Sequence, residues 1–388
     1  MSRDVHTNPI YLDNAATTPV DPRVREVMQP FFEAQFGNPS SKHRLGIRAA
    51  EALDVAREYV AKATGAEPRR VYFTAGGTEA NNLAIQGFAR AAKANGRHVV
   101  IGPTEHSCVR DSAHALADEG FEVEVMRLDA QGGLDLEHAA SLIREDTILV
   151  AQMVASNEYG TVYPIRELSR IVRQNAPNAV LHVDGVQALG KLDVDLTELG
   201  ADSIGLSAHK IHAPKGTGAL VLKRDIPLRP LFFGGGQESK VRPGTQNPAG
   251  IAAFGEAVRL CELDRSEAAQ RLAALRDRLA EGLVRAGARV LKPGDVFLPN
   301  ILSVMMPGVP AEVRLHHLDA SGVMASAGAA CQATSKDVNP ALLALGLDAE
   351  QSRSVLRFSL GRFTTEAEVD EAIGIVARVS EELSALSS

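Results

Sequence analysis

Residues 70–79 read Arg-Val-Tyr-Phe-Thr-Ala-Gly-Gly-Thr-Glu, a β-rich run that passes through a glycine turn into a helix. A helical stretch at residues 49–64 precedes this run, and another at residues 78–95 follows it. Short strands joined by helices are typical of a parallel sheet, because parallel neighbours need a crossover connection. This stretch therefore predicts an α/β fold.

The same alternation continues along the chain to residue 222. The further apolar runs that predict strands lie at residues 98–101, 121–125, 147–150, 179–183, 202–206 and 217–222. Such short apolar runs, separated by helices, indicate a sheet that helices cover on both faces. The last two runs lie too close in sequence for a crossover helix, so one of them is predicted to be antiparallel. We expect a mostly parallel mixed sheet.

The character of the sequence changes at residues 234–248, a loop rich in glycine, proline and polar side chains. An amphipathic helix with four leucines between Leu272 and Leu283 follows, and then a stretch that reads as an α+β unit. We predict a large α/β domain at residues 16–255. A smaller α+β domain would combine residues 1–15 with residues 256–388.

Composition narrows the classes of function. The 388 residues carry a net charge of −7, which argues against a nucleic-acid partner. No apolar run reaches the length of a membrane span, and the N-terminus lacks a secretory signal, so we expect a cytoplasmic protein with no membrane partner. The three cysteines form no C-x-x-C pair, so neither a disulfide framework nor a metal site is predicted.

Two motifs resemble known sites and fail at one position each. Residues 185–191, Gly-Val-Gln-Ala-Leu-Gly-Lys, match a phosphate-binding P-loop, but Leu192 stands where Ser or Thr would hold magnesium. A nucleotide-binding protein that uses Lys191 is therefore an unfavoured alternative. Residues 205–209 begin like a nucleophile elbow but end in His209 where that motif needs glycine.

Polar side chains follow the predicted strands at their carboxyl ends, where open α/β sheets bind ligands. The glycine turn before Thr78 offers backbone N–H groups to an anion such as phosphate. Asp184 ends an apolar strand, and a buried carboxylate should face a cation. Lys210 follows another strand, and His106 lies after a third. Together these residues suggest a lysine that binds a phosphate-carrying cofactor through a Schiff base.

The chain resembles the class V aminotransferase family of pyridoxal-phosphate enzymes, in particular its cysteine desulfurase and selenocysteine lyase branch. The motifs occur in family order over nearly the whole chain. They are Tyr11–Pro19, Gly37–Ser40, His43–Gly46, Thr74–Asn82, Thr104–His106, Asn157–Glu158, His182–Asp184, Ser207–Lys210, Gly234–Thr245, Gly328–Cys331 and Arg357–Phe363. The resemblance implies fold type I of these enzymes, with pyridoxal 5'-phosphate as the cofactor.

The resemblance also implies roles for single residues. Lys210 would bind the cofactor covalently and then move the proton on the substrate's Cα, and Asp184 would pair with the ring nitrogen. His106 would stack on the ring and shuttle protons. The remaining contacts to the phosphate and the ring would come from Gly77, Thr78, Asn157, Gln187, Ser207, His209 and Thr245. Thr245 would reach the partner subunit's site, which implies a homodimer.

The substrate contacts follow in the same way. Arg357 would clamp the substrate carboxylate, a task suited to a bidentate guanidinium, and Asn14 and Asn38 would also contact the substrate. Cys331 would decide the chemistry. Its thiolate would attack the sulfur of L-cysteine, which leaves L-alanine and a persulfide on the enzyme. Residues 328–339 are small or polar, which predicts an exposed loop around this cysteine.

Cys108 and Cys261 are interpreted as small buried apolar residues instead.

Selenocysteine lyase activity is the alternative within the family. Residues 232–238 and 324–331 resemble the lyase versions of these segments, and L-selenocysteine would then be the substrate. Residues 332–337 differ from the Thr-Ser-rich segment of desulfurases that serve iron–sulfur cluster assembly. The residues up to Ser388 also do not include the C-terminal extension by which those enzymes dock a scaffold protein. The resemblance leaves room for a sulfur-acceptor protein as a partner, and its identity stays open.

Overall fold

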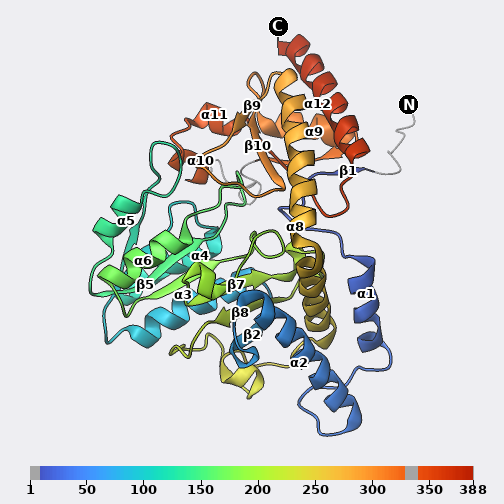
Figure 1. Ribbon diagram of the computed structural model, residues 1–388. Helices are drawn as coiled ribbons and strands as arrows, with labels where there is room; N and C mark the ends of the chain where they lie inside the picture. Colours follow the sequence, from blue (N-terminus) through green and yellow to red (C-terminus); the bar gives the residue numbers. More distant parts are fainter. Residues whose placement is uncertain (1–8, 328–339, 388) are drawn as a thin grey trace.

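The computed structural model describes residues 9–327 and 340–387 (Figure 1). A seven-stranded sheet, in the order β2-β8-β7-β6-β5-β3-β4, forms its larger part. Its strands are β2 (Val71–Thr74), β3 (His98–Ile101), β4 (Glu122–Val125), β5 (Thr147–Met153), β6 (Val180–Asp184), β7 (Ser203–Ser207) and β8 (Gly218–Leu222). β8 runs antiparallel to β2 and β7, and the other neighbours are parallel. The seven predicted strands and the antiparallel pair are confirmed.

Helices cover both faces of this sheet. They are α1 (Pro22–Met28), α2 (Arg44–Thr64), α3 (Gly77–Ala92), α4 (Ser107–His114), α5 (Leu136–Leu142), α6 (Ile165–Asn175) and α7 (Leu196–Leu199). Val100 and Val150 pack on one face in a core shared with α2 and α6. Val99 and Leu149, one residue earlier on the same strands, pack on the other face with α3 and α4. Successive side chains point to opposite faces, so a doubly covered strand is apolar throughout.

A second, four-stranded antiparallel sheet has the order β12-β13-β10-β9. Its strands are β9 (Arg289–Leu291), β10 (Ile301–Met305), β12 (Ser326–Ala327) and β13 (Val355–Ser359). β1 (Ile10–Tyr11) pairs in parallel with β11 (Val323–Met324) beside it. The helices of this part are α9 (Ala311–Ala320), α10 (Pro340–Ala344), α11 (Ala349–Arg353) and α12 (Glu366–Ser387). The N-terminal segment thus lies against the C-terminal third of the chain.

One long helix, α8 (Pro248–Arg285), extends from the part of the molecule with the large sheet to the part with the small sheet (Figure 1). Its first half buries Phe254 in the core of the large sheet, and its second half buries Leu279 in the core of the small sheet. Asp264, between these halves, has non-helical backbone angles (φ −130°, ψ 17°). The predicted boundary at residue 255 falls inside this shared helix, and the division into domains stays a prediction.

Five short 3-10 helices complete the described part of the chain. They are η1 (Gln29–Phe32), η2 (Pro68–Arg70), η3 (Ala115–Glu119), η4 (Ala208–Lys210) and η5 (Gln237–Lys240). Within residues 9–327 and 340–387, none of the helices combines the length and the apolar character that crossing a bilayer requires.

Candidate active site

A cavity of about 870 Å³ opens where β6, β7 and the start of α3 meet. Asp184 is the last residue of β6 and Ser207 the last of β7, so the cavity lies at the carboxyl ends of parallel strands. Ten of the predicted site residues line it: Gly77, Thr78, His106, Asn157, Asp184, Gln187, Ser207, His209, Lys210 and Arg357. Residues from six distant parts of the sequence therefore converge on one space.

Lys210 ends η4, directly after β7. Its Nζ donates to the backbone oxygens of Ala15 and Ala16, each at 2.6 Å. Both alanines belong to the N-terminal segment and line the cavity as well. The N-terminal segment therefore orients the Lys210 amine at the cavity wall.

Asp184 presents a buried carboxylate to the same cavity. The Val186 backbone N–H donates to its Oδ1 at 2.9 Å, and the Asn81 amide donates to its Oδ2 at 2.7 Å. Burial raises the pKa of Asp184, while the Val186 N–H, the nearby His106 and Lys210, and the Asn81 amide act in the opposite direction. A carboxylate with a donor on each oxygen can still accept a further N–H from a ligand.

His106 is the N-cap residue of α4, and its Nδ1 accepts a hydrogen bond from the Cys108 backbone N–H at 3.2 Å. Burial lowers the pKa of His106, so the imidazole is neutral at pH 7. This hydrogen bond leaves Nε2 as the protonated nitrogen. A flat, neutral ring in the wall of the cavity is suited to stacking on a planar ligand.

The start of α3 has the properties of an anion site. Backbone N–H groups in the first turn of this 16-residue helix have no partner within the helix, and Gly77 and Thr78 line the cavity. A Cβ atom on Gly77 would lie 2.6 Å from Val186 Cγ2, so only glycine lets the helix start this close to the turn after β6. Burial lowers the pKa of His209 to about 4, so its ring is neutral. An anion at this place would meet the helix dipole and N–H donors.

Arg357 lies on β13 of the small sheet, and its side chain is almost fully buried. One guanidinium nitrogen donates to the Asn157 backbone oxygen and the other to Asp13 Oδ1, both at 2.9 Å. Its buried Nε has no hydrogen-bond partner among the described residues. An unsatisfied N–H on a buried cation is suited to the carboxylate of a ligand.

Comparison with known proteins agrees with this geometry. The profile of the family described as aminotransferase class-V matches residues 10–372. A cysteine desulfurase IscS from an Anaeromyxobacter species is 42% identical over 98% of this chain and 94% of its own length. Another from Dictyoglomus turgidum is 38% identical over 97% of this chain and 96% of its own length. The chain belongs to the class V aminotransferase family.

Solved structures support the same assignment. A NifS-like protein matches with a TM-score of 0.90 and 36% identity, over 97% of this chain and 99% of that chain. DndA from Streptomyces lividans matches with a TM-score of 0.76 and 36% identity, over 90% and 99% of the two chains. The predicted fold and the predicted resemblance to the cysteine desulfurases are confirmed.

Class V aminotransferases use pyridoxal phosphate, and the cavity has a group for each part of that molecule. Asp184 offers a carboxylate for the ring nitrogen, Lys210 an amine for the aldehyde, and the start of α3 an anion site for the phosphate. The buried Oε1 of Gln187 has no partner among the described residues, while its Nε2 donates to the Ala15 oxygen at 3.0 Å. The residues present therefore fit the family's cofactor.

Three predicted residues lie outside the cavity. The Asn14 side chain is buried and donates to the Ser359 backbone oxygen at 2.9 Å, which is a structural contact. Asn38 is exposed, and its Oδ1 accepts from the Ser40 N–H at 2.9 Å. Neither asparagine lines this chain's own cavity, and their contacts with the substrate stay predictions. Thr245 is exposed. Cys331 lies outside the described residues.

Asn81 and Glu105 are neighbours of the site to which the sequence analysis assigned no role. Asn81 lies one helical turn after Gly77, so both residues are on one face of α3. This four-residue spacing is the signal by which Asn81 could have been predicted from the sequence. The Glu105 Oε1 accepts from the Met153 N–H at 2.6 Å, and its buried Oε2 has no partner among the described residues. Burial raises the pKa of Glu105 to about 8, so this carboxyl is mostly neutral at pH 7. It lies in the motif Thr104–His106, but nothing in the sequence indicated that its carboxyl would be buried.

Both described cysteines are poor nucleophiles. Cys108 lines the cavity and Cys261 is buried in α8. Burial raises the pKa of Cys108 to about 12 and that of Cys261 to about 11, so both thiols stay protonated at pH 7.

The P-loop-like segment serves the fold. Its Lys191 Nζ donates to the Lys210 backbone oxygen at 3.4 Å, and burial lowers the pKa of Lys191 to about 8. A phosphate-binding lysine must reach into open space, so this placement gives no support to the nucleotide-binding alternative.

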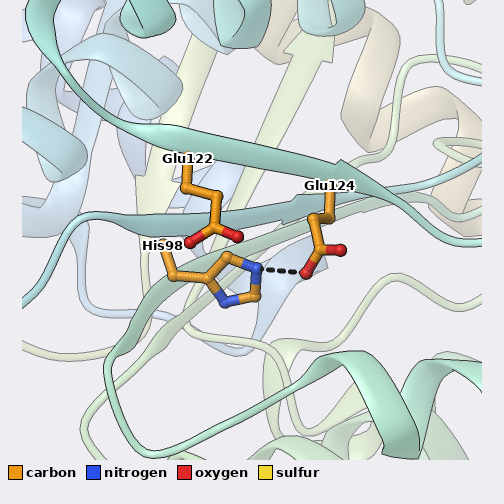
Figure 2. Close-up of side chains that lie close together, drawn as sticks. All are labelled: His98, Glu122 and Glu124. Carbon is orange, nitrogen blue, oxygen red and sulfur yellow. Dashed lines mark hydrogen bonds and ion pairs between the residues drawn. The ribbon is translucent and has the colours of Figure 1, made fainter.

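A second group of potential ligands, His98, Glu122 and Glu124, lies at the far edge of the large sheet on β3 and β4 (Figure 2). His98 Nε2 lies 2.9 Å from Glu124 Oε2, and its Nδ1 lies 2.8 Å from Thr147 Oγ1. Arg144 pairs with both glutamates. Both ring nitrogens and both carboxylates are thus held by neighbouring side chains, and the group is a hydrogen-bonded network of the sheet edge.

Proposed function

We propose that this protein is a cysteine desulfurase that converts L-cysteine to L-alanine and holds the released sulfur as a persulfide on Cys331. One observation carries the proposal: Lys210, Asp184 and Arg357 converge on one cavity in a chain whose relatives over nearly full length are cysteine desulfurases. The cavity has a place for the cofactor and, beside it, a guanidinium for an amino acid's carboxylate.

Each of these residues has a distinct task. Pyridoxal phosphate, when bound, supplies an electron sink next to the substrate's Cα. Asp184 holds a proton on the ring nitrogen by pairing with it, and His106 packs against the ring face. Arg357 fixes the substrate carboxylate, and this orients the Cα–H bond. Lys210 takes the proton from Cα and returns protons to the product.

Sulfur transfer needs a thiolate, and Cys331 is the cysteine to which we assign it. The Cys331 sulfur attacks the substrate sulfur and forms an S–S bond, and the substrate's C–S bond breaks. The electron pair of that bond stays with the carbon, which is protonated to become the methyl group of alanine. The enzyme keeps one sulfur atom as Cys331–S–SH. A thiol reductant or a thiol-bearing acceptor protein then removes this sulfur and restores the thiol.

A paired assay tests the proposal. L-Cysteine and L-selenocysteine are supplied to the wild type and to Cys331→Ala, with and without dithiothreitol, and alanine is measured. We expect the wild type to form alanine from L-cysteine faster with the reductant, and Cys331→Ala to lose at least about 100-fold of this rate. Equal rates on L-cysteine for the two proteins would refute the persulfide route. A Cys331→Ala enzyme that retains full rate only on L-selenocysteine would identify the lyase alternative.

We also propose a homodimer in which Thr245 contributes to the partner subunit's cofactor site. Thr245 is exposed and does not line its own chain's cavity, whereas Phe232 does line it, and Phe232 and Phe233 expose 53% and 89% of their surfaces. Aromatic side chains are enriched at protein–protein interfaces, which supports the proposal. Mixed dimers of Lys210→Ala and Thr245→Ala test this arrangement. Because one site then has both residues intact, activity should recover to about half that of the wild type, and no recovery would contradict the exchange.

A further inference from the structure

Four buried side chains form a continuous hydrogen-bonded chain behind the cofactor site. His182 lies on β6 two residues before Asp184, and it is paired in register with Ser203 on β7. His182 Nδ1 lies 2.9 Å from Ser203 Oγ, and His182 Nε2 lies 3.1 Å from Asn81 Oδ1. The Asn81 amide nitrogen then reaches Asp184 Oδ2 at 2.7 Å. Ser203, His182 and Asn81 are fully buried.

With Asp184 ionised, the direction of every hydrogen bond in this chain follows from the donors and acceptors present. Asn81 must turn its NH₂ group to the Asp184 carboxylate, which only accepts, so its oxygen faces His182. His182 Nε2 therefore carries the hydrogen. Burial lowers the pKa of His182 to about 3, so the ring is neutral and its Nδ1 accepts from the Ser203 hydroxyl. Donors point from Ser203 through His182 and Asn81 to Asp184.

The backbone around the chain is shaped to admit Asn81. Gly205, the register partner of Asp184 on β7, lies against this side chain. A Cβ atom at Gly205 would lie 2.0 Å from Asn81 Oδ1. Glycine inside a strand weakens the sheet, and such positions mark a close approach of another group. At Gly205, the group that comes close to the strand is the side-chain carbonyl of Asn81.

We propose that Asn81, His182 and Ser203 are positioning residues, a directed relay that keeps the Asp184 carboxylate ionised and turned toward the cofactor's ring nitrogen. The inference rests on the proposed function, because it assigns Asp184 to that nitrogen. Asn81 occupies one oxygen of the carboxylate and the Val186 N–H occupies the other at 2.9 Å. Both bonds favour the anion over the acid. The rotation of the carboxylate is thereby fixed before the cofactor binds.

The titratable groups that face Asp184 are His106, Lys210, Glu105 and Cys108. Burial keeps His106 neutral at pH 7, and it keeps Cys108 protonated. Glu105 is mostly protonated at pH 7 as well, so it adds little negative charge beside Asp184. Of the two carboxyl groups here, Asp184 and Glu105, the relay therefore acts on Asp184, the one that the proposal requires to be ionised.

The test compares Asn81→Leu, His182→Leu and His182→Gln with the matched control His98→Gln, in the full chain loaded with pyridoxal phosphate. The measurements are the dissociation constant of the cofactor and the pH midpoint of its visible absorption band. A hydrogen bond to a charged group contributes about 1.5–3 kcal/mol, so Asn81→Leu should weaken cofactor binding about 10- to 100-fold and shift the midpoint. His182→Leu should have the same sign with a smaller effect. His182→Gln, which keeps a donor toward Asn81, should restore most of the binding.

Ser203→Ala keeps the test decisive if a leucine variant does not fold, because it removes only the hydroxyl at the far end of the relay. It should weaken cofactor binding by about twofold to fivefold. Leucine variants, or Ser203→Ala, with the wild-type dissociation constant and midpoint would overturn the relay. So would a rescue variant that binds no better than His182→Leu. A wild-type protein that takes up no pyridoxal phosphate would instead refute the proposed function itself.

Discussion

Two buried histidines of the large sheet, His182 and His98, make the same pattern of hydrogen bonds in different regions of the molecule. In both, Nδ1 meets a hydroxyl on the neighbouring strand, Ser203 or Thr147, and Nε2 meets a side-chain oxygen. The chain from His182 ends at Asp184 in the cavity, whereas the network of His98 ends at Glu124 and Arg144 on the edge of the sheet.

Burial and hydrogen bonding therefore do not by themselves mark a functional histidine. Both rings are needed to satisfy their neighbours, since a buried polar group without a partner is costly. Only the network that ends on a carboxylate in the wall of the cavity can alter the chemistry there. Changes on the cavity side should therefore alter activity and the cofactor's spectrum, and changes at the sheet edge should alter stability alone.

Among the variants with changes at the cavity, Lys210→Ala should lose the most activity. The amine that binds the cofactor and moves the proton is lost, so alanine formation from L-cysteine should fall by at least about 1,000-fold. The visible absorption band should vanish too, while the thermal midpoint of the cofactor-free protein should change little. A variant that keeps a tenth of the wild-type rate would contradict the role of Lys210.

Glu105 near the cavity and Glu124 at the sheet edge differ in their hydrogen bonds. The buried Oε2 of Glu105 has no partner within residues 9–327 and 340–387, whereas Glu124 pairs with His98. Glu105 should therefore make the stability of the protein depend on pH. The pKa of Glu105 is about 8 in the folded protein and about 4.3 in the unfolded chain. Between these values the folded state holds a proton that the unfolded state has lost. The free energy of unfolding should therefore fall on the order of 3 kcal/mol as the pH rises from about 5 to about 8.

Glu105→Gln provides the control for this pH effect. Its amide cannot ionise, so urea unfolding of this variant should show a smaller loss of stability between pH 5.5 and pH 8.5 than the wild type. Identical pH dependence in the two proteins would mean that Glu105 does not titrate in this range.

Arg357→Ala tests the substrate side of the cavity. Loss of hydrogen bonds from a guanidinium to a carboxylate should lower kcat/KM for L-cysteine about 10- to 100-fold, mainly through KM. Arg357→Lys should fall in between, since an ammonium lacks the planar pair of donors. The cofactor's absorption band should be unchanged in both variants. A loss confined to kcat would place Arg357 in another role.

His98→Leu should have the smallest effect on function. It removes one of the partners of Glu124 and one of those of Thr147, so the free energy of unfolding should drop by about 1–2 kcal/mol. The cofactor's absorption band and the rate of alanine formation should stay at the wild-type level, because the network ends at the sheet edge. Chemical denaturation and an absorption spectrum of the protein loaded with the cofactor check both statements. A changed spectrum would contradict the prediction that only the network of His182 affects the cofactor.

The sequence predicted the large sheet well for a physical reason. Its strands are short apolar runs between helices, and residues at strand ends such as Asp184 and Lys210 are brought together by the topology of the sheet itself. It did not predict Asn81 or Glu105, whose roles depend on contacts between distant segments. Asn14 was expected at the substrate because it lies in a recognised motif, yet its amide binds the backbone of β13.

The most direct test of the account is to locate the cofactor on the chain. The protein loaded with pyridoxal phosphate is reduced with borohydride, digested and analysed by mass spectrometry. We expect a pyridoxyl adduct on Lys210 and none on Lys215, which lines the same cavity, or on the half-buried Lys191. An adduct on either of those lysines, or no adduct at all, would contradict it.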